Sequence, residues 1–296
     1  MKQFTGSIKL TFRELWAMKI TLGLFIVTTI AWLMLSFALN LDVVEGSIAA
    51  VRIFGLQSEP TELIRDSDTG KIIRDEEGDL QRQALSLDKF VVGINQFVFS
   101  LAYIFGTLIG LFATMPLVSG FLEEGRIDLL LSKPISRIKL LSGHLAGVCL
   151  VVFLLSAYLI GGVWLVIAYK TGIWQFEFLL AIPTITIMFA VIFSVVLTTS
   201  VASRSTGLAL VLAYGTIFVS AILAARDQIV PQLSEFWGAM FVGMYHLLPN
   251  YFEVMQIMTQ LASKETVTSY YPLISSILFG VTIYVFGFIT FSRRDF

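Results

Sequence analysis

Residues 178–201 read FLLAIPTITIMFAVIFSVVLTTSV, a run of 24 residues without a single Lys, Arg, Asp or Glu. At a rise of 1.5 Å per residue, a helix of about 20 apolar residues crosses the hydrocarbon core of a bilayer. The stretch therefore predicts a membrane-spanning helix. Five further segments meet the same criterion, namely Ile20–Leu41, Val91–Val118, Leu140–Ala168, Gly207–Ala225 and Pro272–Phe291.

The composition agrees with this prediction. Hydrophobic residues make up 56% of the 296 residues, charged residues only 14%, and the mean hydropathy is +0.84. Soluble domains are nearer a quarter charged, and disordered chains are poor in apolar residues, so both classes are excluded. A net charge of −1 argues against a nucleic-acid partner. The single cysteine, Cys149, excludes an internal disulfide and a cysteine-rich zinc cluster.

We therefore expect a single domain over residues 1–296, an all-α integral membrane protein with six transmembrane helices. Six spans place both termini on one side of the membrane. If that side is the cytoplasm, the inner segments carry eleven Lys and Arg and five Asp and Glu, against nine and sixteen in the longer outer segments. The denser positive charge inside predicts a multi-pass protein of the cytoplasmic membrane with both termini in the cytoplasm.

Residues 7–19 precede the first span. Ile8, Phe12, Leu15 and Trp16 fall on one helical face, which predicts an N-terminal helix lying in the membrane interface. A disordered basic tail is the alternative.

Two outer loops are long. In residues 42–90, the turn-forming run Ser67–Gly70 separates Thr61–Arg65 from Lys71–Arg74, which fits either a small β-hairpin or a solvated loop. A lone hairpin is marginal in water, so it would pack on the membrane domain or on an extracytoplasmic partner. In residues 226–271, Phe236–Met244 and Tyr251–Leu261 are too short to span and predict interfacial or re-entrant helices.

The loop at 119–139 is the most informative segment, and residues 120–137 read GFLEEGRIDLLLSKPISR. Glu123 and Glu124 suit the positive end of a helix, Ile127 begins an apolar face, and Pro134 stops the helix. A helix this short needs a surface to lie on. Lipid headgroups and a soluble partner both fit that requirement.

The stretch from Glu124 to Arg137 resembles the signature of type-2 ABC transporter permeases, including the glycines that follow at Gly143 and Gly147. The chain end at Phe291–Phe296 and the stretch Leu248–Phe252 resemble that family more weakly. The resemblance implies a permease subunit of an ATP-driven exporter, without catalytic activity of its own. It also implies that the 119–139 loop holds a coupling helix docked on an ATPase, and that the N-terminal helix is an elbow helix.

The residues implied to couple to the ATPase are Glu123, Glu124, Gly125, Arg126, Asp128, Leu130, Leu131, Lys133 and Pro134. The expected assembly has two ATPase subunits and a second permease copy, as a homodimer or with a related chain. This chain has no GxxxxGK[ST] phosphate loop, so we expect ATP and Mg²⁺ on the partner ATPase and no cofactor or metal here.

Polar and small side chains form a stripe on the second span, at spacings of 4, 3, 4, 3 and 4 residues: Gln96, Ser100, Tyr103, Thr107, Gly110 and Thr114. The stripe fits either close helix packing or a polar translocation path. The resemblance implies that spans two and five line the path, which adds Tyr214 and Thr216 as candidates.

Two rival functions remain open. An ion-driven secondary transporter would use charged residues inside the spans, and none is present. A non-transporting membrane anchor or assembly factor could recruit a soluble protein through the same short helix. His246 and Glu253 form a weak metal or proton constellation, and His144 is expected to be packed or interfacial.

Overall fold

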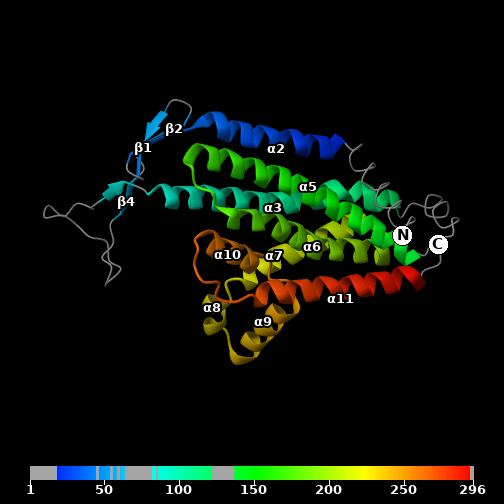
Figure 1. The fold of residues 1–296 in the computed structure, drawn as a ribbon. Coiled ribbons are helices and arrows are strands. Elements are labelled where there is room, and N and C mark those ends of the chain that lie inside the picture. The colour runs from blue at the N-terminus through cyan, green and yellow to red at the C-terminus, as the bar shows by residue number, and fades with distance from the viewer. Residues whose placement is uncertain are drawn as a thin grey trace.

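The computed structural model describes residues 19–44, 47–53, 56–58, 61–63, 82–84, 86–121 and 137–293. Long helices form a bundle, with strands near one end (Figure 1). The long helices are α2 (Lys19–Ala38), α3 (Leu87–Phe121), α5 (Arg137–Thr171), α6 (Ala181–Ser203), α7 (Thr206–Leu223) and α11 (Tyr271–Arg293).

Five of these helices, α3, α5, α6, α7 and α11, are long and apolar enough to cross a membrane. The apolar part of α2 within the described residues, Thr21–Phe37, is shorter, so the predicted count of six spans is not confirmed. The predicted first span also ran too far, because Leu39–Leu41 belong to strand β1 (Leu39–Val44) and not to a helix. The chain is a multi-pass membrane protein.

Several helix ends gather at one end of the bundle. The N-terminal end of α2, the C-terminal end of α3, the N-terminal end of α5 and the C-terminal end of α11 all lie there (Figure 1). The loop predicted at 119–139 therefore joins two helices at the end of the bundle where the described chain also begins and ends. The predicted interfacial helix at 7–19 lies outside the described residues, apart from Lys19.

Helix α6 lies at the centre of the bundle, against α3, α5, α7 and α11. Half of its apolar window is buried, compared with 17% for α11. Phe189 and Phe193 stack on one another in its core with ring centroids 5.6 Å apart. The uncharged run at residues 178–201 has thus become the helix against which four others pack.

Glycines bring α11 close to α6. A Cβ atom on Gly287 would overlap the Thr198 side chain, and one on Gly280 would lie 3.2 Å from the Val191 Cα. The Thr198 hydroxyl donates to the Ile283 carbonyl at 3.0 Å. Small residues at such a contact let two backbones approach and add hydrogen bonds where no water competes.

Helix α2 packs on α5 through an aromatic contact. The rings of Phe25 and Tyr158 stack at 4.6 Å, and the hydroxyls of Thr29 and Tyr158 share a hydrogen bond of 3.0 Å. A Cβ atom on Gly162 would come within 2.9 Å of the Trp32 ring. The missing side chain at Gly162 therefore makes room for this tryptophan.

The predicted fourth span begins with a 3₁₀ helix, η1 (Phe176–Leu180), before α6 starts at Ala181. Pro183 lies in the first turn of α6. A proline there removes no helical hydrogen bond, because the first N–H groups of a helix have no partner within it.

The strands lie between α2 and α3. Strands β1, β2 (Ser47–Ile53) and β3 (Leu56–Ser58) form an antiparallel sheet, and β4 (Thr61–Leu63) pairs with β5 (Arg82–Ala84). The predicted hairpin is not confirmed. Its first arm overlaps β4, but β4 pairs with a segment about 20 residues further on, and the expected second arm, Lys71–Arg74, lies outside the described residues.

Short elements connect α7 to α11: α8 (Arg226–Ile229), η2 (Val230–Gln232), α9 (Glu235–Leu247) and α10 (Tyr251–Ala262). The helical conformation is interrupted between α9 and α10 at Leu248–Asn250, where Pro249 prevents a continuous helix. Helix α10 buries Tyr251, Val254 and Met258 against the bundle, whereas α9 exposes Phe236 and Trp237.

Candidate functional site

The residues implied to couple to an ATPase lie between the end of α3 at Phe121 and the start of α5 at Arg137. All of them fall in 122–136, outside the described residues: Glu123, Glu124, Gly125, Arg126, Asp128, Leu130, Leu131, Lys133 and Pro134. Nearby on α5, His144 is buried, with 5% of its surface exposed. The structure therefore describes the two helices that flank the loop, α3 and α5.

The polar stripe on α3 faces the interior of the chain. Tyr103, Thr107 and Thr114 are almost fully buried, at 0%, 1% and 3% exposure. Gly110 is buried too, and a Cβ atom there would come within 3.1 Å of the Phe189 ring on α6. Ser100 is half-buried. The regular spacing thus correctly marks one face of the helix.

Tyr103 and Tyr251 hold α3 against the start of α10. The Tyr103 hydroxyl donates to the Tyr251 carbonyl at 2.7 Å, and the Tyr251 hydroxyl donates to the Tyr103 carbonyl at 2.6 Å. Their ring centroids are 4.4 Å apart. The Tyr251 N–H donates to the Ser220 hydroxyl of α7 at 2.8 Å, so three helices meet at this pair.

Gln96 makes the second link between α3 and α10. Its amide nitrogen donates to the Thr259 carbonyl at 3.2 Å and to the Ser263 hydroxyl at 2.9 Å. The stripe is therefore tied to α10 at two points along the helix.

The two candidates on α7 behave differently. The Tyr214 hydroxyl donates to the Leu108 carbonyl of α3 at 2.9 Å. Thr216 donates to the Leu212 carbonyl of its own helix at 2.9 Å. Tyr214 thus joins the seam around the stripe, and Thr216 does not bridge two helices.

Within one chain, the stripe forms a packing seam between α3 and its neighbours. The opposite face of α3 is exposed and apolar, and its members are Phe97, Leu101, Phe105, Ile109 and Phe112. The assignment of the stripe to a translocation path stays a prediction.

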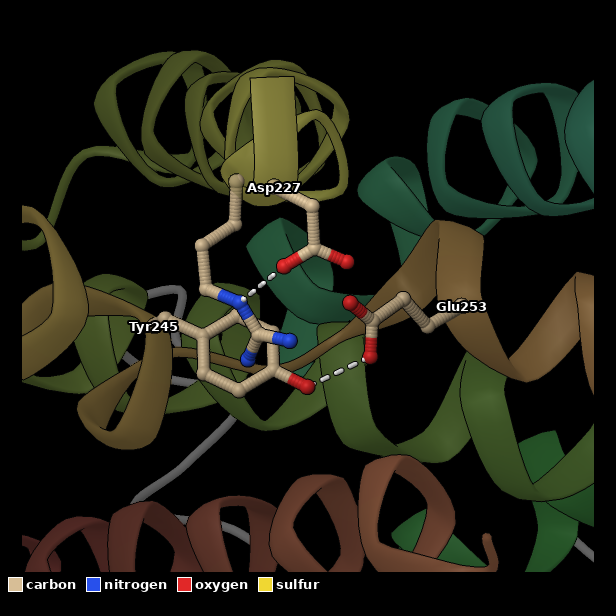
Figure 2. A network of polar contacts seen from close by, with 4 residues as sticks. Asp227, Tyr245 and Glu253 are labelled. Atoms are coloured by element: carbon tan, nitrogen blue, oxygen red, sulfur yellow. Dashed lines mark hydrogen bonds and ion pairs between the residues drawn. The ribbon is translucent and has the colours of Figure 1, made fainter. Parts of the chain in front are cut away.

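A second polar cluster, which sequence reasoning did not assemble, joins α8, α9 and α10. Arg226 pairs with Asp227 through a 3.1 Å bond, and its guanidinium lies 4.2 Å from the centroid of the Tyr245 ring. The Tyr245 hydroxyl donates to Glu253 at 2.6 Å (Figure 2). Burial and this hydrogen bond raise the pKa of Tyr245 above its ordinary value.

His246 and Glu253, which the sequence suggests as a weak metal or proton site, have different partners in the structure. Glu253 is hydrogen-bonded to Tyr245, while a ring nitrogen of His246 contacts the Tyr271 hydroxyl. Among the described residues, no group of three or more His, Cys, Asp or Glu is arranged to hold a metal ion. The cluster lines a cleft of about 440 Å³, and Thr268 and Tyr271 form its wall on the α11 side.

Sequence spacing could not have found this cluster. The cluster draws its residues from three elements, with Arg226 on α8, Tyr245 on α9 and Glu253 on α10. The turn at Leu248–Asn250 brings α10 back to α9, and no sequence spacing predicts that approach. The one available signal was the presence of charged residues in a loop that otherwise reads as apolar.

A family model described as ABC-2 family transporter protein matches residues 69–296. A comparison with curated proteins finds no match.

Proposed function

The chain belongs to the ABC-2 family of transporter proteins and is a permease component of an ABC transporter, and we propose that its 119–139 loop couples it to a separate ATPase subunit. The observation that carries this proposal is the family membership, because the matched region contains the whole loop. In this account ATP and Mg²⁺ bind to the ATPase, and the permease itself catalyses no reaction.

The loop is well placed for such a role. It joins the C-terminal end of α3 to the N-terminal end of α5, both of which are 35-residue helices. A push on a loop held by two long helices is transmitted along their whole length. Leu130 and Leu131 would supply the apolar contacts to the ATPase, while Glu124, Arg126 and Asp128 would set the register.

We further propose that two copies of the chain face each other, each carrying one ATPase. The exposed apolar side of α3 and the exposed residues Val211 and Phe218 of α7 supply surface for such a contact. The cargo would leave the cytoplasm along a path between the copies.

The stripe lies on the opposite face of α3 from the exposed apolar residues, so it would reach such a path only after α10 and α7 move away from α3 and the helix turns toward the second copy. Thr107 tests the idea, because its buried hydroxyl forms no hydrogen bond within the described residues. Thr107→Val keeps the shape of the side chain and removes only the hydroxyl. A path residue predicts reduced transport at unchanged Tm, and a purely structural residue predicts unchanged transport.

The membrane side of the loop can be tested by cysteine labelling. Since Cys149 is the only native cysteine, Cys149→Ser provides a cysteine-free background. A membrane-impermeant maleimide should label Ser132→Cys only in inside-out vesicles. Ser269→Cys, in the outer loop, should react only from the other side. Labelling of Ser132→Cys from outside would contradict the proposal.

A further inference from the structure

A second cleft, of about 540 Å³, lies at the beginning of α3, between the α5–η1 connection and the end of α10. Figure 1 places the start of α3 at the opposite end of the bundle from the C-terminal end of α3 and the N-terminal end of α5. The cleft shares Gln96 with the stripe and is separate from the Tyr245 cluster.

Buried amides form the floor of the cleft. Gln175, which is 5% exposed, accepts a hydrogen bond from Asn95 at 2.6 Å and donates to the Ala262 carbonyl at 2.7 Å. Gln96 and Ser263 complete the floor through their 2.9 Å bond. These contacts hold the three walls together, so the cleft is preformed.

One wall of the cleft is apolar and aromatic. Ile173 and Trp174 line it, and the Trp174 ring lies 5.2 Å from the Trp164 ring, edge to face. Phe176 adds a third ring to the same cluster and is 62% exposed. Tryptophans gathered at the end of a membrane helix are typical of the level of the lipid headgroups.

The rim carries two charges of each sign, from Asp88, Lys89, Lys264 and Glu265. Lys264 makes no ion pair with a described residue. A rim that is balanced in this way offers an ammonium to the phosphate and a carboxylate to the ammonium of a zwitterion, whereas a ligand of one sign would leave one pair of rim charges unmatched.

Lys264 is also held in an unusual backbone conformation. Its φ is +56°, in the left-handed region, at the point where α10 ends. The Lys264 N–H donates to the Leu261 carbonyl, and the Glu265 N–H donates to the Gln260 carbonyl. These two bonds form the Schellman motif that ends many helices, in which glycine usually occupies the position of Lys264. The chain tolerates a strained residue where glycine would fit better, and such outliers point to function.

We propose that this cleft binds the phosphoethanolamine headgroup of a membrane phospholipid. The Lys264 ammonium lies at the phosphate, and the Asp88 and Glu265 carboxylates accept hydrogen bonds from the lipid ammonium. Trp174 and Ile173 contact the first part of the acyl chains. The test measures bound lipid directly, so it needs neither the transported cargo nor the ATPase.

Native mass spectrometry of the purified full-length chain, incubated in mixed micelles of phosphatidylethanolamine and phosphatidylglycerol, measures the bound lipid. The wild type should retain phosphatidylethanolamine preferentially. Gly93 lines the cleft, and a Cβ atom there meets nothing within 4 Å, so Gly93→Leu starts from open space and places its side chain in the cleft. It should reduce this retention about tenfold, the equivalent of one good charge-assisted bond. Gly243→Leu on α9, equally free of contacts, should not.

A second variant separates function from folding. Lys264→Gly relieves the backbone strain, so its Tm should stay unchanged or rise while retention of phosphatidylethanolamine falls. Arg204→Gly is the matched control, since Arg204 is the other described non-glycine residue with positive φ, at 55°. It should leave lipid retention unchanged.

Equal retention of both lipids by the wild type, or equal retention by the wild type and Gly93→Leu, would overturn the proposal. Displacement of the lipid by an equal concentration of soluble phosphoethanolamine would overturn the assignment to a lipid, because the apolar wall would then contribute nothing.

Discussion

At the residue scale, the Tyr103 and Tyr251 pair joins segments that are 148 positions apart in the chain. Each ring covers the other while each hydroxyl satisfies the carbonyl of its partner residue. Both hydroxyls are buried away from water, so each would lie there without a partner if the two helices were not joined. The pair therefore ties α3 to α10 through ring contact and two hydrogen bonds together.

Tyr103→Phe should lower the free energy of unfolding by about 1 kcal/mol, since it removes one of the two buried hydrogen bonds between α3 and α10. Thermal unfolding in detergent measures this change. Tyr169→Phe is the control, because Tyr169 is 90% exposed and should tolerate the change. Equal Tm values for both variants would show that the reciprocal bonds do not hold α10 in place.

The Tyr245 cluster predicts a dependence on pH. The pKa of Tyr245 is raised by burial and by Glu253, so the folded chain holds the phenol proton more tightly than the unfolded chain does. This contribution to stability is intact below about pH 10, the ordinary tyrosine pKa, and is lost as the pH rises through the raised pKa.

The Tm of the wild type should therefore fall more steeply above about pH 10 than the Tm of Tyr245→Phe. At neutral pH the variant should be less stable by about 1 kcal/mol, because the hydrogen bond to Glu253 is gone. Parallel Tm curves for the two proteins between neutral and alkaline pH would contradict this role.

At the element scale, the contact between α6 and α11 depends on the absence of side chains at two positions. Gly287→Ala should destabilise the chain by about 1–3 kcal/mol, as overpacking does, because the new Cβ overlaps Thr198. Thr198→Ala should recover part of this loss in the double variant. Gly215→Ala on α7, where no atom lies within 4 Å, should be neutral or stabilising.

Additive effects of Gly287→Ala and Thr198→Ala would show that the two positions do not touch. Urea or thermal unfolding of the four proteins gives the coupling energy directly.

Much of this element-scale picture can be predicted from the sequence, because a span is a local property. The length of an apolar run is enough to locate α6 or α11, and the spacing from Gln96 to Thr114 is enough to define one face of α3. Neither the length of a run nor the spacing of a stripe predicts which helix packs against that face. The pairing of β4 with β5 and the meeting of Arg226 with Tyr245 arise only from tertiary folding, so no spacing rule predicts them.

The largest error at this scale has a simple cause. Residues 39–41 continue the apolar run of the first span, and hydropathy alone cannot distinguish the last turn of a helix from the first residues of a strand. Pairing of Leu39 with Ile53 decides in favour of the strand.

At the scale of the whole molecule, the two ends of the bundle have different chemistry. One end gathers the C-terminal end of α3 and the N-terminal end of α5, while the other carries the strands (Figure 1). The cleft beside Trp174 lies near the start of α3, at this second end. Under the two proposals above, the permease receives work at the first end and binds lipid at the second. The seam between α3 and α10 lies between them.

The central claim is that the 119–139 loop receives work from a companion ATPase. ATP hydrolysis by that ATPase, measured with the permease in proteoliposomes, tests it most directly. The wild-type chain and the control Leu233→Arg, which changes an exposed leucine outside the loop, should both stimulate hydrolysis, and Leu130→Arg should abolish the stimulation while Tm stays unchanged. Full stimulation by Leu130→Arg would contradict the account.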